Sequence, residues 1–169
     1  MKKIFLTMAL LACTAGIMTV SAQKKVALKV STVAQGAESK TVNVTKDKKG
    51  YITLFDGKNL DGWRGYGKDH VPARWTVEDG CLKFNAGQGE GGDIIFAHKF
   101  KNFILEMEWK VSKGANSGIF YLAQEVKNDK GGMEPIFISA PECQVLDNEN
   151  HPDAKLGVDG NRKASSLYD

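Results

Sequence analysis

The chain reads WTVEDGCLKF over residues 75–84, and this stretch indicates the class of fold. Apolar and β-branched residues alternate with polar ones on both sides of the pair Asp79-Gly80. An Asp-Gly pair between two such runs is the sequence signal of a tight β-hairpin. The stretch therefore predicts two antiparallel strands joined by a two-residue turn.

Similar short runs recur along the chain, separated by turns rich in Gly and Asp. The further expected strands cover residues 51–55, 93–97, 103–111 and 119–123, with a last one ending at Leu146. The alternation is clearest over residues 103–111, and it places Trp109 on the core side. No long segment has helical periodicity, and the 18 Gly residues fit turn-rich β structure. Evenly spaced short strands favour an all-β sandwich.

Residues 1–22 have the composition of an export signal. Two lysines precede an apolar run, and small residues at 20–22 predict cleavage before Gln23. A membrane anchor is the competing interpretation, but the run is short for a span. A lipoprotein signal would use Cys13, yet the apolar run continues past it. We therefore expect an exported bacterial protein, periplasmic, on the cell surface or secreted, with no stable membrane span after signal cleavage.

Residues 23–50 form a Lys-rich leader that is poor in aromatic residues. Its alternating valines fit two short strands, and a solvated, loosely ordered segment fits equally well. The aromatic, turn-rich domain then covers residues 51–169. Removal of residues 1–22 takes away two of the 23 basic residues and none of the 20 acidic ones, so the mature chain is nearly neutral. No basic stripe with interleaved aromatics is present, so nucleic acid is not an expected partner.

Two cysteines, Cys81 and Cys143, remain after signal cleavage. Export would permit a disulfide between them. We expect two buried thiols in strands instead, because nothing in the sequence brings them together. Neither cysteine has the paired spacing of a zinc site.

Residues 141–148 read PECQVLDN, and His151 follows a few positions later. In a strand, Glu142 and Gln144 project from the same face, while Cys143 and Val145 point into the core. Beyond the strand end lies the turn from Asp147 to His151, where a base, an acid or a metal ligand would be held. The pattern suggests a carbohydrate-type cleft on a sheet face.

Several motifs occur in an order that resembles the 3-keto-disaccharide hydrolase family over residues 51–169. They are LFDGKNLDGW at 54–63, WTVEDG at 75–80, NF at 102–103, EWK at 108–110, NSGI at 116–119, PECQVLDN at 141–148 and SLYD at 166–169. The resemblance implies a concanavalin-A-like jelly roll, with two curved antiparallel sheets and a sugar cleft on the concave face. Family sequences continue beyond the Leu-Tyr-Asp position, so it also implies a chain that is incomplete at its C-terminus.

Glucanases of this architecture carry three acidic groups at alternate positions of one strand. The equivalent positions here are Glu142, Gln144 and Leu146, two of which cannot ionise. Retaining hydrolysis needs two carboxyl groups, so a conventional endoglucanase is disfavoured. A 3-keto sugar offers another route, because the ketone acidifies the hydrogen on C2. A base removes that hydrogen, the C1 substituent leaves, and water can add back.

The resemblance thus leads to an enzyme that cleaves 3-keto-glycosides, with a small sugar as its partner. We assign the role of base or metal ligand to Glu142 or His151, with Asp147 orienting His151. The expected sugar contacts are Gln144, Asn116, Trp63 and Arg64. A divalent metal ion held by Glu142 and His151 would stabilise the enolate, although the spacing does not demand one.

Other interpretations remain open at this point. A non-catalytic sugar-binding module of the same fold would bind ligand without turnover and would tolerate substitution of Glu142. Asp147-Asn148 fits simple turn chemistry, in which the side chains bond to the backbone. Residues 116–118 fit a turn before a strand equally well.

Overall fold

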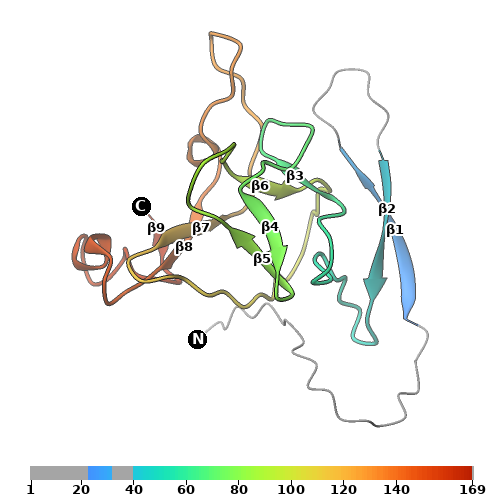
Figure 1. Cartoon of the computed structure of the whole chain (residues 1–169), viewed down its shortest axis with the longest axis horizontal. Coiled ribbons are helices and arrows are strands. Elements are labelled where there is room, and N and C mark those ends of the chain that lie inside the picture. Colours follow the sequence, from blue (N-terminus) through green and yellow to red (C-terminus); the bar gives the residue numbers. More distant parts are fainter. Residues whose placement is uncertain (1–22, 32–39, 169) are drawn as a thin grey trace. The chain divides into compact units, whose positions relative to one another are not determined.

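The computed structural model describes residues 23–31 and 40–168, which fall into two compact units. The first unit ends at Glu106 and the second begins at Met107. Both consist of β-strands and irregular segments, with two short 3-10 helices in the second (Figure 1). The all-β class is therefore confirmed, whereas the concanavalin-A-like arrangement of two curved sheets stays a prediction. The expected export signal, residues 1–22, lies outside the described residues.

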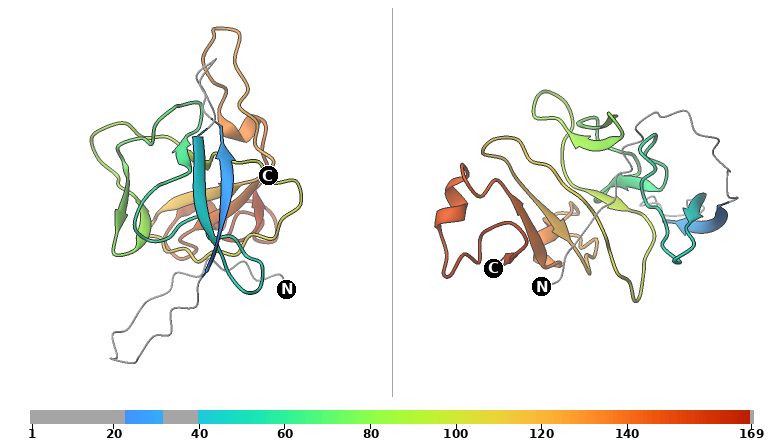
Figure 2. Two further views of the ribbon diagram at one scale, coloured as in Figure 1. Left: turned by 90° about the vertical axis from the view of Figure 1, so that its right-hand side faces the viewer. Right: turned by 90° about the horizontal axis from the view of Figure 1, so that it is seen from below.

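A long antiparallel hairpin begins the first unit. Strands β1 (Lys24–Val30) and β2 (Lys40–Lys46) pair along their whole length and lie side by side in Figure 2. Leu28, Val30 and Val44 are buried, while the lysines of both strands are exposed. Of the two interpretations left open for residues 23–50, the structure therefore shows the strands.

Two short strands and an aromatic pair form the middle of the first unit. Strand β3 (Trp63–Gly65) pairs with β6 (Ile94–Phe96), close to the strand expected at residues 93–97. The Trp63 and Phe96 rings meet edge to face with centroids 5.6 Å apart. A Cβ at Gly62 would lie 2.7 Å from the Phe96 ring, so only glycine leaves room for this packing.

Arg64 connects the hairpin β1–β2 to strand β3. Its side chain is 5% exposed, and its Nε donates a hydrogen bond of 3.0 Å to the carbonyl of Ser31, just after β1. Nη1 donates to the carbonyls of Gly65 and Lys68 at 3.1 and 3.2 Å. Ser31 in turn donates its backbone N–H to the Ala97 carbonyl at 2.7 Å. The hairpin is thus bonded into the first unit.

The hairpin predicted over residues 75–84 is present. Strands β4 (Trp75–Glu78) and β5 (Cys81–Phe84) pair in register, with Asp79 and Gly80 at the turn. Their φ angles of 49° and 72° place both turn residues in the left-handed region that a two-residue hairpin turn requires.

A three-stranded antiparallel sheet organises the second unit. Strand β8 (Glu142–Leu146) lies between β7 (Asn116–Phe120) and β9 (Leu167–Tyr168). The 3-10 helix η1 (Ile136–Ile138) precedes β8, and η2 (Pro152–Lys155) follows it. Residues 116–118 belong to strand β7, so the alternative of a turn at that position is wrong.

Two expected strands are wrong. Residues 103–111 pair with no described strand, and Trp109 is 40% exposed rather than in the core. Alternation of side chains marks one apolar face, but a strand also needs a neighbour that accepts its backbone hydrogen bonds. Residues 51–55 form only an isolated bridge, between Ile52 and Lys46.

Among residues 23–31 and 40–168 there is no helix with the length and apolar character that a membrane span requires.

Replacement of Arg64 by Met tests the bond between the hairpin and the first unit. The variant leaves three carbonyl acceptors without their charged donor, so we expect the free energy of unfolding to fall by about 2–3 kcal/mol. Urea unfolding followed by Trp fluorescence measures the change. The exposed control Lys58→Met should stay within about 0.5 kcal/mol of the parent chain. Equal stability of the two variants would contradict the role of Arg64.

Candidate functional site

One face of the β7–β8–β9 sheet carries three of the seven predicted site residues, Glu142, Gln144 and Asn116. Glu142 is paired with Phe120 of β7 on one side and Tyr168 of β9 on the other. Gln144 is paired with Gly118, and Asn116 with Leu146. Because alternate residues of a strand share a face, these seven side-chain positions lie on one side of the sheet. The predicted common face of Glu142 and Gln144 is therefore confirmed.

Gly118 provides the space in which the Glu142 side chain lies. A Cβ at position 118 would overlap Oε1, Cδ and Cγ of Glu142. Gly118 is not among the residues with positive φ, so its backbone does not require glycine. The missing side chain is what matters: the Glu142 carboxylate lies across strand β7, directly over its backbone.

Gln144 is almost completely buried, with 1% of its side chain exposed. Its Oε1 accepts a hydrogen bond of 3.1 Å from the backbone N–H of Val145. In this structure the side chain therefore offers a sugar almost no surface. Asn116, in contrast, is exposed at the first position of β7.

The Asp147 carboxylate closes the turn after β8. Oδ2 accepts bonds of 2.7 Å from both the Gly114 N–H and the Asn150 side chain, and Oδ1 accepts from the N–H groups of Glu149 and Asn150. The Gly114 N–H first, and then the Asn150 amide, hold the pKa of Asp147 below its usual value. This is the turn chemistry left open above, and the carboxylate makes no bond to the His151 ring.

His151 begins the helix η2 as its N-cap. Its ring atom Nδ1 accepts a hydrogen bond of 3.1 Å from the backbone N–H of Asp153. The backbone N–H of His151 donates to the Asp147 carbonyl at 2.9 Å. In the part of the chain that the structure describes, no group of three or more His, Cys, Asp or Glu is arranged to hold a metal ion. The metal ion expected at Glu142 and His151 therefore stays a prediction, and we derive no step through one.

Cys81 and Cys143 are free thiols in strands, as expected, although both are half-buried rather than buried. Burial, and then the neighbouring Glu142 carboxylate, raise the pKa of Cys143. A thiol that holds its proton more tightly is a weak nucleophile at neutral pH. Cys143 is therefore no candidate for a covalent step.

The two remaining predicted sugar contacts lie in the first unit and serve its packing. The Trp63 ring contacts Phe96, and its Nε1 donates a hydrogen bond of 2.8 Å to the Leu54 carbonyl. Arg64 is the buried link to Ser31 described above. Trp63 is half-buried and Arg64 is buried in this structure.

A polar cluster beside Glu142 was not found by sequence reasoning. Arg162 Nη1 donates a hydrogen bond of 2.6 Å to the Tyr168 hydroxyl, and its guanidinium carbon lies 4.8 Å from the centre of the Tyr168 ring. The Tyr168 hydroxyl donates to Asp153 Oδ2 at 3.3 Å. The sequence signal was the position of Tyr168 in the motif SLYD, which we used for the resemblance alone.

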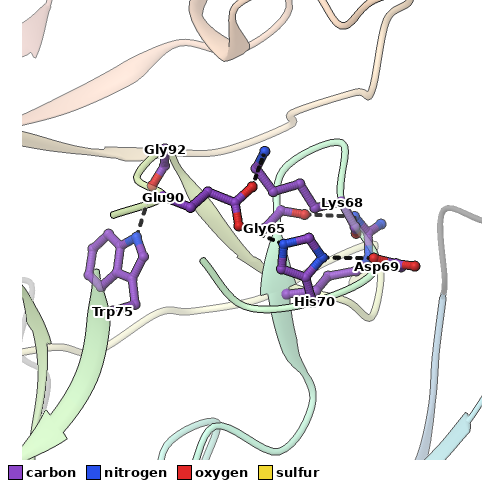
Figure 3. A network of polar contacts seen from close by, with 8 residues as sticks. Gly65, Lys68, Asp69, His70, Trp75, Glu90 and Gly92 are labelled. Carbon is purple, nitrogen blue, oxygen red and sulfur yellow. Dashed lines mark hydrogen bonds and ion pairs between the residues drawn. The ribbon is translucent and has the colours of Figure 1, made fainter. Parts of the chain in front are cut away.

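A second missed cluster lies on the first unit (Figure 3). His70 contacts Asp69 Oδ1 through Nδ1 at 2.8 Å and Glu90 Oε2 through Nε2 at 2.6 Å. Lys68 pairs with the other Glu90 oxygen at 2.8 Å. Asp69, and then Glu90, raise the pKa of His70. With both ring nitrogens bonded to carboxylates, His70 joins the loop after β3 to the loop before β6.

A cavity of about 110 Å³ lies elsewhere on the first unit, beside strand β2. Its polar lining comes mainly from Asn43, Asp56, Asn59 and Asp61. Pockets for small ligands usually measure about 300–1,000 Å³, so this cavity is small for a disaccharide. It contains none of the predicted site residues.

The sheet face with Glu142 is the candidate site, and comparison with known proteins now adds the family. The family model described as the 3-keto-alpha-glucoside-1,2-lyase-like domain matches residues 50–169. The chain belongs to this family. The match contains all seven predicted site residues.

A curated relative from Bacteroides thetaiotaomicron is described as a 3-keto-disaccharide hydrolase. It is 56% identical over 191 aligned residues, and the alignment covers 100% of this chain and 66% of the relative. The chain thus spans less than two thirds of the length of this relative.

Substitution Gly118→Ala tests the position of Glu142. The new methyl group overlaps the carboxylate, so we expect the free energy of unfolding to fall by about 1–3 kcal/mol. In a Glu142→Ala background the same change should cost almost nothing, because the overlapping group is gone. Chemical unfolding of both single variants and the double variant gives the coupling. The control Ser117→Ala, on the other face of β7, should show no such coupling, and additive effects of G118A and E142A would refute the contact.

The His70 cluster makes stability depend on pH. Because the pKa of His70 is raised in the folded chain, its contribution is complete below the unfolded value of about 6.5 and disappears as pH rises through the folded value. The pKa values of Asp69 and Glu90 are lowered in the folded chain, so the stability that these two carboxylates contribute is lost as pH falls through their folded values. Melting temperatures from pH 5 to 9 should fall less steeply for His70→Gln than for the parent chain. Identical slopes would show that the contacts in Figure 3 do not stabilise the fold.

Proposed function

We propose that this chain cleaves the glycosidic bond of 3-keto-glycosides, with the Glu142 carboxylate as the base that takes the hydrogen from C2. The observation that carries this proposal is the position of that carboxylate over Gly118. Glu142 is also the residue of β8 that pairs with Tyr168 of β9. The printed description of the family names a 1,2-lyase, and that of the relative names a hydrolase for 3-keto-disaccharides. The first description supports chemistry at C1 and C2 of a keto sugar, and the second supports a 3-keto-disaccharide as the substrate.

The chemistry needs one carboxylate rather than two. Loss of the C2 hydrogen forms an enolate, and the enolate then expels the C1 substituent to leave a C1–C2 double bond. Water added across that bond gives the products of net hydrolysis. This route fits a strand in which Glu142 is followed at the next two same-face positions by Gln144 and Leu146. It avoids the pair of carboxyl groups that direct hydrolysis requires.

The site of action proposed with this function is outside the cytoplasm. Support comes from the sequence alone, through the basic start, the apolar run and the small residues at 20–22. In that compartment the substrate would be a small sugar that another enzyme has already oxidised at C3.

Substitution Glu142→Gln tests the proposed base. It keeps the size of the side chain and removes its basicity, so we expect the turnover rate to fall by about 10²–10⁴-fold with an unchanged melting temperature. Mass spectrometry of products from a 3-keto-glucoside and from its unoxidised parent measures turnover and selectivity. A parallel reaction with chelator reports on the metal expected from the sequence. Glu149→Gln, in the exposed turn after β8, is the matched control and should keep full activity.

Retained turnover by the folded Glu142→Gln variant would remove Glu142 from the mechanism. Binding of the keto sugar without cleavage, by the parent chain itself, would favour the non-catalytic sugar-binding module instead.

A further inference from the structure

The Tyr168 hydroxyl lies on the same sheet face as the proposed base. Tyr168 and Glu142 are directly opposite residues of the neighbouring strands β9 and β8. Opposite residues of antiparallel strands have Cβ atoms about 4.5–5.5 Å apart and point to the same side. The Glu142 carboxylate turns toward Gly118 of β7, so a ligand in contact with both side chains lies across strand β8.

Arg162 contacts Tyr168 in two ways. Its Nη1 donates a hydrogen bond of 2.6 Å to that oxygen. Its guanidinium carbon also lies 4.8 Å from the ring centre, within the range of a cation–π contact. A phenol that accepts a charged hydrogen bond donates its own hydrogen more strongly, because each bond polarises the next.

Asp153 holds the phenol hydrogen only weakly. The distance from the Tyr168 hydroxyl to Asp153 Oδ2 is 3.3 Å, which is long for an O–H···O bond. The hydrogen is thus directed by Asp153 in the free protein and is available to a better acceptor. An oxyanion is such an acceptor.

We propose that Tyr168 is a second catalytic residue, whose hydroxyl binds the enolate oxygen on C3, and that Arg162 is its positioning residue. This inference rests on the proposed function. The C2 hydrogen passes as a proton to Glu142, its electron pair forms the C2–C3 double bond, and the carbonyl pair moves to the C3 oxygen, where the Tyr168 O–H binds it. The electron pair on the C3 oxygen then re-forms the C3 carbonyl. The C2–C3 pair moves to form the C1–C2 double bond, and the C1–O bond breaks. The departing oxygen takes a proton, which the Glu142 carboxylic acid supplies.

If Tyr168 and Arg162 had a purely structural role, the Tyr168 hydroxyl would not affect the reaction rate. The Tyr168 ring and the Arg162 guanidinium would then only hold β9 against the loop before it. Tyr168→Phe keeps the ring and its cation–π contact and removes only the hydroxyl. The variant therefore separates chemistry from packing.

The experiment compares Tyr168→Phe, Arg162→Gln and Arg162→Lys with the control Lys163→Gln, an exposed neighbour. Rates are measured on two 3-keto-glucosides, one with a nitrophenol leaving group and one with an alkyl alcohol. We expect Tyr168→Phe to lower kcat by about 10²-fold on both, with KM within about threefold and the melting temperature unchanged. A nitrophenol needs no proton to leave, so an equal loss on both substrates assigns the hydroxyl to the enolate oxygen.

Arg162 should act through the hydroxyl. Arg162→Gln is expected to lower kcat in the parent chain and to have little further effect in the Tyr168→Phe background. Arg162→Lys, which keeps the charge, should recover part of the rate.

Three outcomes would overturn the inference. Tyr168→Phe within threefold of the parent kcat removes the hydroxyl from the reaction, and a loss confined to the alkyl glucoside makes Tyr168 an acid for the leaving group instead. If the parent chain cleaves neither substrate, the proposed function fails and this inference fails with it, whereas an active parent with an active Tyr168→Phe variant contradicts only the inference.

Discussion

Strand β8 is hydrogen-bonded on both sides, and this double pairing is the constraint on which the second unit depends. It brings residues from three separate segments onto one sheet face, where Gly118, Glu142 and Tyr168 are neighbours. Gly118 leaves the space that the Glu142 carboxylate occupies. The Gly114 N–H, before β7, donates a hydrogen bond to the Asp147 carboxylate, after β8. This bond helps to fix the register of the two strands at that end of the sheet. The position of the proposed base is thus a consequence of backbone pairing and of one missing side chain.

The sequence predicted local elements better than it predicted which segments pair or pack with one another. The hairpin at residues 75–84 was predictable, because an Asp-Gly turn and its flanking strands are encoded in ten consecutive residues. The strand expected at residues 103–111 was wrong, since alternation defines an apolar face but says nothing of which segment supplies the hydrogen bonds. For the lysine-rich residues 23–50, the pattern alone could not decide between strands and a solvated segment. The decision comes from long-range contacts such as that between Arg64 and Ser31.

The candidate site was predictable only where the alternation of side chains along a strand decides which face a residue lies on. Glu142 and Gln144 share a face, as the pattern required, but the pattern could not show that Gln144 is 1% exposed. Asp147 followed local turn chemistry, which is encoded over three residues. Arg162 and Tyr168 were missed because their contact depends on the path of a whole loop. The His70 cluster was missed for the same reason: Glu90 is twenty residues away along the chain. Trp63 and Arg64 were predicted as sugar contacts, yet the half-buried Trp63 packs on Phe96 and the buried Arg64 bonds to backbone carbonyls.

In the proposed mechanism, Glu142, Gly118 and Tyr168 all contribute to the abstraction of the proton from C2. The most direct measurement is a reaction of the parent chain with a 3-keto-glucoside in D2O, with the position of deuterium read by NMR against a reaction without protein. We expect the released 3-keto sugar to carry deuterium at C2, because the hydrogen is removed before the C1–O bond breaks and is replaced from solvent. Cleavage that leaves the original hydrogen on C2 would show direct hydrolysis and would contradict the role assigned to this sheet face.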